Sequence, residues 1–142
     1  LPPFDGVIPA LERMSASADL IICSQTPEEA LVREWEQHGI DGYVRVIAGQ
    51  ELGTKAEHLR LASRDRYPPG RVLMVGDAPG DLRAARETGA LFFPIVPGAE
   101  IASWQRLTCE AYDRFLDNTY AGAYQDDRIA AFEDALPATP PW

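Results

Sequence analysis

Cysteine, lysine and long apolar runs are scarce in this sequence, and each shortage excludes a class of protein. The two cysteines, Cys23 and Cys109, show no framework spacing, which favours reduced thiols in the cytoplasm over a secreted disulfide scaffold. No apolar run reaches the roughly 18 residues that span a membrane, and no secretory signal pattern opens the chain, so we expect no membrane partner. The net charge of −9 argues against nucleic acid as a partner, because its phosphate backbone attracts basic surfaces.

Lysine occurs once, at Lys55, while the other 12 of the 13 basic residues are arginine. A chain that otherwise uses arginine therefore has lysine at one position, which makes Lys55 a candidate functional residue. The chain begins with Leu1 and not with Met, and we expect it to be a piece whose natural start lies elsewhere.

The apolar pattern predicts one α/β domain. With 142 residues, 46% of them hydrophobic, the chain is long and apolar enough to form a core. Short apolar runs predict strands at 18–23, 44–48, 72–75 and 91–96. Spacings of three and four residues predict helices at 6–14, 26–37, 55–65, 79–88, 99–117 and 125–136. Because strands and helices alternate, we expect a parallel sheet with right-handed crossovers.

Two details of this pattern are specific. Pro94 cannot donate a ladder hydrogen bond, so strand 91–96 is expected toward the edge of the sheet. In the long helix at 99–117, helical spacing predicts an inward face made of Ile101, Trp104, Thr108, Ala111, Tyr112 and Phe115.

Polar residues stand at strand ends and helix starts. Ser24 ends the first strand, Lys55 opens a helix, and Asp77 and Asp81 follow the third strand. These groups suit phosphoryl transfer, because a hydroxyl binds phosphoryl oxygens, an ammonium neutralises developing charge, and paired carboxylates hold Mg²⁺. Gln25, beside Ser24, is a further candidate for binding the phosphate.

The order of these motifs resembles the haloacid dehalogenase (HAD) superfamily of phosphatases and related hydrolases. The matching segments are LIICS, GTKAEHL, GDxxxD and, near the start, PFDGV, which is similar to the segment that re-enters the core after the family's cap. The resemblance covers about residues 3–97 and implies a three-layer Rossmann-like (HAD-like) parallel sheet. It implies a partial core at 1–97 and a C-terminal helical extension at 98–142, packed on the same domain.

The resemblance also implies roles for the site residues. Ser24 would hydrogen-bond the transferring phosphoryl group, and Lys55 would stabilise its charge. Asp77 would bind Mg²⁺, and Asp81 would support the ion directly or through water. The implied substrate is a small phosphorylated metabolite.

One part of the family pattern is absent, because no D-x-D occurs anywhere in the sequence. The family's nucleophile is the first Asp of that motif, at the end of the first core strand, so we assign no nucleophile here. The resemblance implies that the first core strand and the cap lie upstream, and that this chain is inactive alone. In the family, that strand separates the ones that correspond to 18–23 and 72–75. We therefore expect either direct pairing of these two strands, or a missing N-terminal segment or a second chain in the gap.

Simpler interpretations stay open for each residue. Ser24, Gln25 and Asp77 also suit turns, Lys55 also suits a solvated helix start, and Asp81 also suits a helix cap. A non-catalytic HAD-like domain for binding or assembly is the alternative function. A response-regulator receiver fits worse, because it needs an acidic pair where this chain has Ser24 and Gln25.

Overall fold

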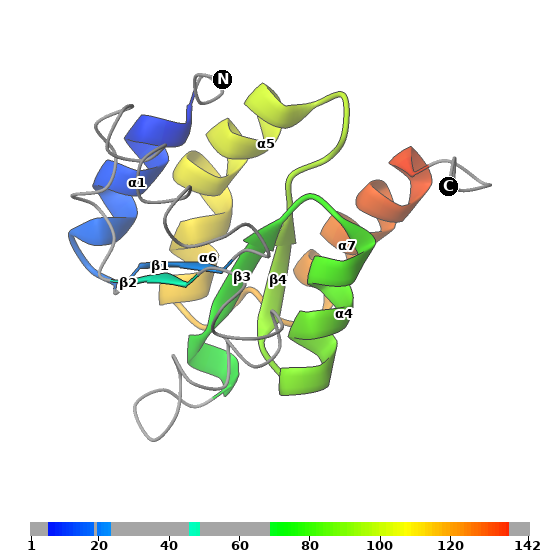
Figure 1. Ribbon diagram of the computed structural model, residues 1–142, viewed down its shortest axis with the longest axis horizontal. Coiled ribbons are helices and arrows are strands. Elements are labelled where there is room, and N and C mark those ends of the chain that lie inside the picture. The colour runs from blue at the N-terminus through cyan, green and yellow to red at the C-terminus, as the bar shows by residue number, and fades with distance from the viewer. Residues whose placement is uncertain (1–5, 19, 24–45, 49–68, 137–142) are drawn as a thin grey trace.

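The architecture is seen in a computed structural model that describes residues 6–18, 20–23, 46–48 and 69–136 (Figure 1). The described strands are β1 (Ile21–Cys23), β2 (Val46–Ala48), β3 (Leu73–Gly76) and β4 (Leu91–Pro94). The described helices are α1 (Val7–Ser15), α4 (Pro79–Thr88), α5 (Glu100–Arg106), the π-helical η4 (Leu107–Ala111), α6 (Tyr112–Leu116) and α7 (Ala123–Ala135), with the 3-10 turn η3 at Pro69–Arg71. Alternating strands and helices make this an α/β fold, as the sequence predicts. The helices predicted at 26–37 and 55–65 lie outside the described residues.

The described strands form two parallel pairs. β1 pairs with β2, and β3 pairs with β4 in a register that sets Met74 opposite Phe92. No ladder joins β1 to β3 within the described ranges, so the expected direct pairing of these strands is wrong. Each strand instead pairs with the next along the described chain, and the short crossover through α4 favours the β3–β4 pair because loop closure costs less for shorter connections. An additional segment between the two pairs stays a prediction.

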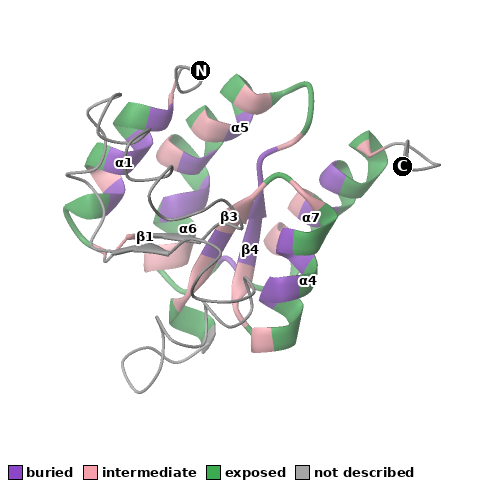
Figure 2. Cartoon of the chain, in the orientation of Figure 1, coloured by how far each residue is buried: buried purple, intermediate pink, exposed green. Residues whose placement is uncertain are grey.

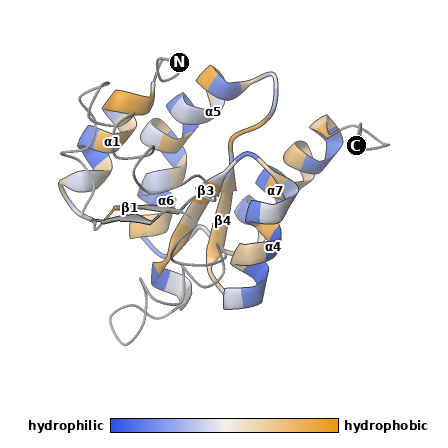
Figure 3. Ribbon diagram, viewed as in Figure 1, coloured by the Kyte–Doolittle hydropathy of each residue, from blue (hydrophilic) through white to orange (hydrophobic). Residues whose placement is uncertain are grey.

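Helices cover both faces of the β3–β4 pair. In Figure 1, α1, α5 and α6 lie on one side of these strands, and α4 and α7 lie on the other. The strands themselves are the most apolar ribbons in Figure 3. Such continuous apolar runs are expected for parallel strands that are buried on both faces.

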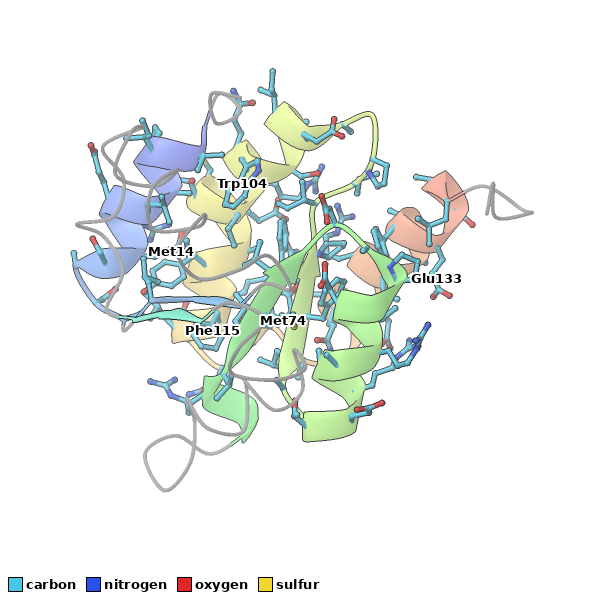
Figure 4. All side chains as sticks on the ribbon, viewed as in Figure 1. Met14, Met74, Trp104, Phe115 and Glu133 are labelled. Carbon is cyan, nitrogen blue, oxygen red and sulfur yellow. The ribbon has the colours of Figure 1, made fainter. Side chains whose placement is uncertain are left out.

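Successive residues of β4 point into different cores. Phe93 packs in the first core cluster with residues of α1, η4 and α6, among them Met14 and Tyr112, and Trp104 lies against it (Figure 4). Phe92 packs in the second cluster with α4 and α7, where its ring centroid is 5.8 Å from that of Phe132. The inward faces of the helices are accordingly the buried ones in Figure 2.

Helix α4 has the predicted bounds, and its ends follow from the sequence. Pro79 is the first helical residue, where its missing N–H costs nothing. The helix ends before Gly89, which takes the left-handed conformation at φ 76° that favours glycine. The predicted helices at 6–14 and 125–136 match α1 and α7 closely.

The predicted helix at 99–117 is present from Glu100 to Leu116, but its inward face differs from the prediction. Ile101 is 45% exposed, while Ser103 and Leu107 are buried. The cause is η4, whose π turn inserts one extra residue into the helix. Upstream of this turn, the buried face is shifted by one position relative to regular α-helical spacing.

The last helix packs on the core. Ile129 and Phe132 of α7 are buried against β4 and α4, in the second cluster. The division of the chain at 97 and 98 stays a prediction. Among the described residues, no helix is long and apolar enough to cross a membrane.

Candidate functional site

The structure brings two of the predicted site residues together, Asp77 and Asp81, in the turn that joins β3 to α4. We define the β3–α4 turn as residues 76–81; it lies at the carboxyl end of β3 (Figure 1). Open parallel sheets bind ligands at this end of their strands. Ser24, Gln25 and Lys55 lie outside the described residues, so their predicted roles stay predictions.

The buried side chain of Asp81 stabilises this turn. Its side chain is only 3% exposed, and its Oδ2 accepts hydrogen bonds from the backbone N–H groups of Asp77 at 3.0 Å and Ala78 at 3.1 Å. Asp81 is the third residue of α4, where a carboxylate can reach back to the donors that precede the helix. One carboxylate oxygen therefore satisfies two N–H groups at the helix start, as the simpler interpretation of Asp81 as a cap implies.

Gly76 makes room for this carboxylate. A Cβ at position 76 would lie 2.4 Å from Oδ2 of Asp81 and 2.5 Å from its Cβ, well inside van der Waals contact. Glycine in the GDxxxD motif is thus required by the close approach of Asp81, four residues after Asp77. The sequence analysis quoted Gly76 only as part of the motif and missed this steric role.

The backbone also ties the turn to the neighbouring strand. The carbonyl oxygen of Gly76 accepts a hydrogen bond of 2.7 Å from the N–H of Ile95, just after β4. The carbonyl oxygen of Ala78 accepts one of 2.9 Å from the N–H of Asp81. Together with the Asp81 side chain, these bonds fix the backbone on both sides of Asp77.

Within the described residues, the carboxylate of Asp77 takes no part in this network. The residue is exposed, and no hydrogen bond or ion pair reaches its carboxylate from the described part of the chain. The turn therefore presents one carboxylate to solvent on a backbone that Asp81 holds in place.

Carboxylate oxygens of this kind fit Mg²⁺, which is commonly held by one or two carboxylates and keeps several waters. Asp77 is the residue in the turn that suits a direct contact. Oδ2 of Asp81 already accepts two N–H groups, which fix the backbone at Asp77 and Ala78. No group of three or more metal-ligating side chains occurs in the described ranges, so the turn supplies only part of a coordination shell.

The comparisons with known proteins agree with the motifs. A family model described as haloacid dehalogenase-like hydrolase matches residues 1–95, which include the β3–α4 turn. No curated protein and no solved structure matches the chain.

Proposed function

Because the chain belongs to the haloacid dehalogenase-like hydrolase family, we propose that it carries part of the active site of a Mg²⁺-dependent phosphatase. Its substrate would be a small phosphorylated metabolite. The observation that carries the proposal is the β3–α4 turn, in which Asp81 and Gly76 hold the exposed carboxylate of Asp77 at the end of a parallel strand.

The chain's own residues would divide the work of binding. Asp77 would hold Mg²⁺, which when bound would neutralise charge on the phosphoryl oxygens. Ser24, helped by Gln25, would hydrogen-bond the phosphoryl group, and Lys55 would balance its negative charge. Asp81 would keep the turn closed, so that Asp77 needs no rearrangement before binding.

The nucleophile would come from a D-x-D strand outside this sequence. We infer that this strand completes a three-layer Rossmann-like sheet by filling the gap between the β1–β2 and β3–β4 pairs. The helices on both faces of β3–β4 support this arrangement. A missing N-terminal segment or a second chain would supply the strand, and the protein would act in the cytoplasm.

The test is phosphatase activity with p-nitrophenyl phosphate and Mg²⁺. The 142-residue chain alone should be inactive, and the natural reading frame that contains it should be active if a D-x-D strand precedes Leu1. In that active protein, Asp77→Asn should reduce turnover by about 100-fold, since it replaces a charged metal ligand by a neutral one. Asp126→Asn, an exposed acidic residue of α7, is the matched control and should leave turnover unchanged. Turnover by the 142-residue chain alone would contradict the missing nucleophile.

A non-catalytic HAD-like domain for binding or assembly is the second candidate. It is favoured by one observation, the lack of any D-x-D in the sequence. The coding sequence upstream of Leu1 discriminates the two candidates. A D-x-D strand there supports the enzyme, and a natural start near Leu1 supports the binding domain.

A further inference from the structure

Two buried hydrogen-bond donors without an acceptor lie side by side at the start of α7. The hydroxyl oxygen of Tyr124 and Nε of Arg128 each expose less than 1 Å², and neither finds a hydrogen-bond partner in the described structure. The two residues are four apart on one helix, so their side chains lie on the same face. Buried polar groups are nearly always paired, so both donors call for an explanation.

What is missing here is an acceptor. The Nε–H of Arg128 can only donate, and the phenol of Tyr124 donates readily. Burial raises the pKa of the Tyr124 hydroxyl, and the carboxylate of Glu110 raises it further, against the opposite effects of Arg128, Arg106 and Arg114. Tyr124 therefore keeps its proton near neutral pH and stays a donor.

The surroundings of Tyr124 are positively charged. The guanidinium of Arg114 lies 4.5 Å from the centroid of the Tyr124 ring, and that of Arg128 lies 5.7 Å from it. Neither guanidinium has a carboxylate within 4 Å in the residues described, whereas Arg106 is paired with Glu110 at 3.5 Å. Two guanidiniums without a carboxylate partner among the described residues thus lie around one ring, in a chain whose net charge is −9.

Contacts with β4 hold the start of α7, which carries Tyr124, in place. Tyr120 is fully buried, donates a hydrogen bond of 2.6 Å from its hydroxyl to the carbonyl of Phe92, and packs edge-on against Tyr124 at 5.3 Å between centroids. The N–H of Phe92 donates to Oε1 of Gln125 at 2.8 Å, which ties the first turn of α7 to the same strand. Arg114 is exposed, and within the described residues its guanidinium has one hydrogen bond, of 3.5 Å to the carbonyl of Thr119, beside its contact with the Tyr124 ring, so it can rotate to admit a ligand.

The cluster is separate from the β3–α4 turn. Tyr120 and Gln125 bind β4 at Phe92, opposite Met74, while Asp77 follows the carboxyl end of β3. Figure 1 shows the connection between α6 and α7 near the lower end of β4 and the β3–α4 turn at the upper end.

We propose that Arg114, Tyr124 and Arg128 form a second site, which binds the phosphate group of a small anion. Arg128 would donate from Nε and its terminal nitrogens, Tyr124 from its hydroxyl, and Arg114 from the α6 side. Donors from two elements surround the Tyr124 ring, and the planar fork of a guanidinium matches the geometry of phosphate oxygens. The site depends on neither Mg²⁺ nor a nucleophile, so it stands or falls independently of the proposed phosphatase activity.

The test is an NMR titration of the 142-residue chain with inorganic phosphate, at constant ionic strength and with EDTA to exclude metal. Amide signals of residues 119–128 should shift and saturate, with a dissociation constant of about 1 mM. Tyr124→Phe and Arg128→Gln should each weaken binding about fivefold or more, because each removes one donor. Arg83→Gln, an exposed arginine of α4, is the control with the same charge change and should weaken binding less than about twofold.

Each other outcome is decisive. Shifts that never saturate, shifts confined to the β3–α4 turn, or equal weakening by Arg83→Gln would overturn the site. The wild-type titration needs no variant to fold, so misfolding of a variant leaves the test intact. Glycerol 2-phosphate that binds as tightly as inorganic phosphate would identify a phosphate ester as the ligand, and binding of inorganic phosphate alone would identify the free ion. Equal binding of acetate would overturn the preference for phosphate.

Discussion

At the scale of single residues, Asp81 shows how one carboxylate can organise a turn without meeting a ligand. Hydrogen bonds to an ionised acceptor are roughly twice as strong as neutral ones, and Asp81 accepts two of them while almost completely buried. The exposed Asp77 joins this network only through its backbone N–H, and its carboxylate has no hydrogen bond or ion pair with the described residues. The two acidic residues of the GDxxxD motif therefore have different roles, because Asp81 stabilises the turn while Asp77 presents its carboxylate to solvent.

This difference predicts unequal effects of two similar substitutions on stability. Asp81→Ala should lower the free energy of unfolding by about 2–3 kcal/mol, because it leaves two N–H groups without their acceptor. Asp77→Ala should change it by less than about 0.5 kcal/mol, as an exposed substitution does. Urea denaturation of both variants measures the effect, and equal losses would show that Asp81 does not hold the turn.

Tyr120 makes stability depend on alkaline pH. Burial raises the pKa of its hydroxyl above the ordinary value of 10.0, with a smaller contribution from Tyr124. The unfolded chain then releases this proton first, so the stabilisation is complete below about pH 10 and is lost as pH rises above it, by up to about 1.4 kcal/mol per pH unit.

Tyr120→Phe removes this proton. The unfolding free energy of the variant should therefore fall less steeply than that of the wild type between pH 10 and 11.5, and the difference in slope should correspond to about one proton. At pH 7 the variant should lose about 1 kcal/mol, because the hydrogen bond to Phe92 disappears. Urea denaturation across this pH range gives both values. The same alkaline slope in variant and wild type would contradict the assignment.

The residue types at the site could be read from the sequence, but their contacts could not. Asp77 and Asp81 were expected together, because both follow one strand. The contact between Gly76 and Asp81 depends on the path of the backbone through the turn, which no spacing rule specifies. The cluster around Tyr124 was missed for a similar reason, since Arg114 and Arg128 come from different helices.

At the scale of elements, the π segment η4 is the feature that departs from regular structure. It lies between α5 and α6, and the guanidinium of Arg13 from α1 donates to the carbonyl of Thr108 within it. A second bond, from Arg13 to the carboxylate of Asp113, joins α1 to α6. The extra residue of a π turn disturbs backbone bonding, and Arg13 takes up one of the carbonyls concerned.

Because the π turn of η4 contains one extra residue, we predict that one residue can be deleted there with little loss of stability. Deletion of the exposed Cys109 should let residues 100–116 form one regular α-helix, with Leu107 and Tyr112 still facing the core. Deletion of the exposed Arg83 from the regular helix α4 is the control. It should destabilise far more, because it rotates Leu82 relative to Ala85 by about 100°.

Thermal unfolding followed by circular dichroism compares the two deletions. The deletion at Cys109 should shift the unfolding midpoint by less than half as much as the deletion at Arg83. A deletion at Cys109 that abolishes folding while the α4 deletion is tolerated would contradict the role given to η4.

Most described elements were predictable because periodicity and end signals agreed. The bounds of α4 follow from Pro79 and Gly89, and those of α7 follow from the spacing of Ile129 and Phe132. The buried face of α5 was predicted wrongly because the prediction assumed 3.6 residues per turn along the whole helix. No residue type in 107–111 indicates a π turn, so the shift of the buried face could be found only in the structure.

At the scale of the whole molecule, two apolar clusters share one pair of strands. Phe93 belongs to the cluster with α1, η4 and α6, while Phe92 belongs to the cluster with α4 and α7. Both clusters depend on the β3–β4 ladder, so neither can persist without it. We expect them to unfold in one transition and to lack direct side-chain coupling.

A double-mutant cycle tests this expectation. Leu107→Val in the first cluster and Phe132→Leu in the second should each cost about 1 kcal/mol, through lost packing at fully buried sites. The double variant should lose the sum of both within about 0.5 kcal/mol, because the residues lie on opposite faces of the strands. Two separate transitions in denaturant, or a large coupling energy, would contradict a single folding unit.

The class of fold was predictable at this scale, but the pairing of its strands was not. Alternating strands and helices indicated parallel pairing, and both described pairs are parallel. Which strands become neighbours depends on contacts between distant parts of the chain. Direct pairing of strand 18–23 with strand 72–75 was one of two expected alternatives; within the described residues each of these strands instead pairs with the next strand along the chain.

The contact between Gly76 and Asp81 also limits the order in which substitutions can accumulate at these two positions. Every missense change at codon 76 adds a Cβ, so each one meets the same carboxylate whatever its chemistry. Only glycine at position 81 would relieve the clash, because the Cβ of Asp81 would also lie 2.5 Å from the new Cβ, and glycine there also removes the acceptor for two N–H groups. A lineage that replaces Gly76 must therefore first pass through a destabilised intermediate at position 81, and the motif changes as a unit or not at all.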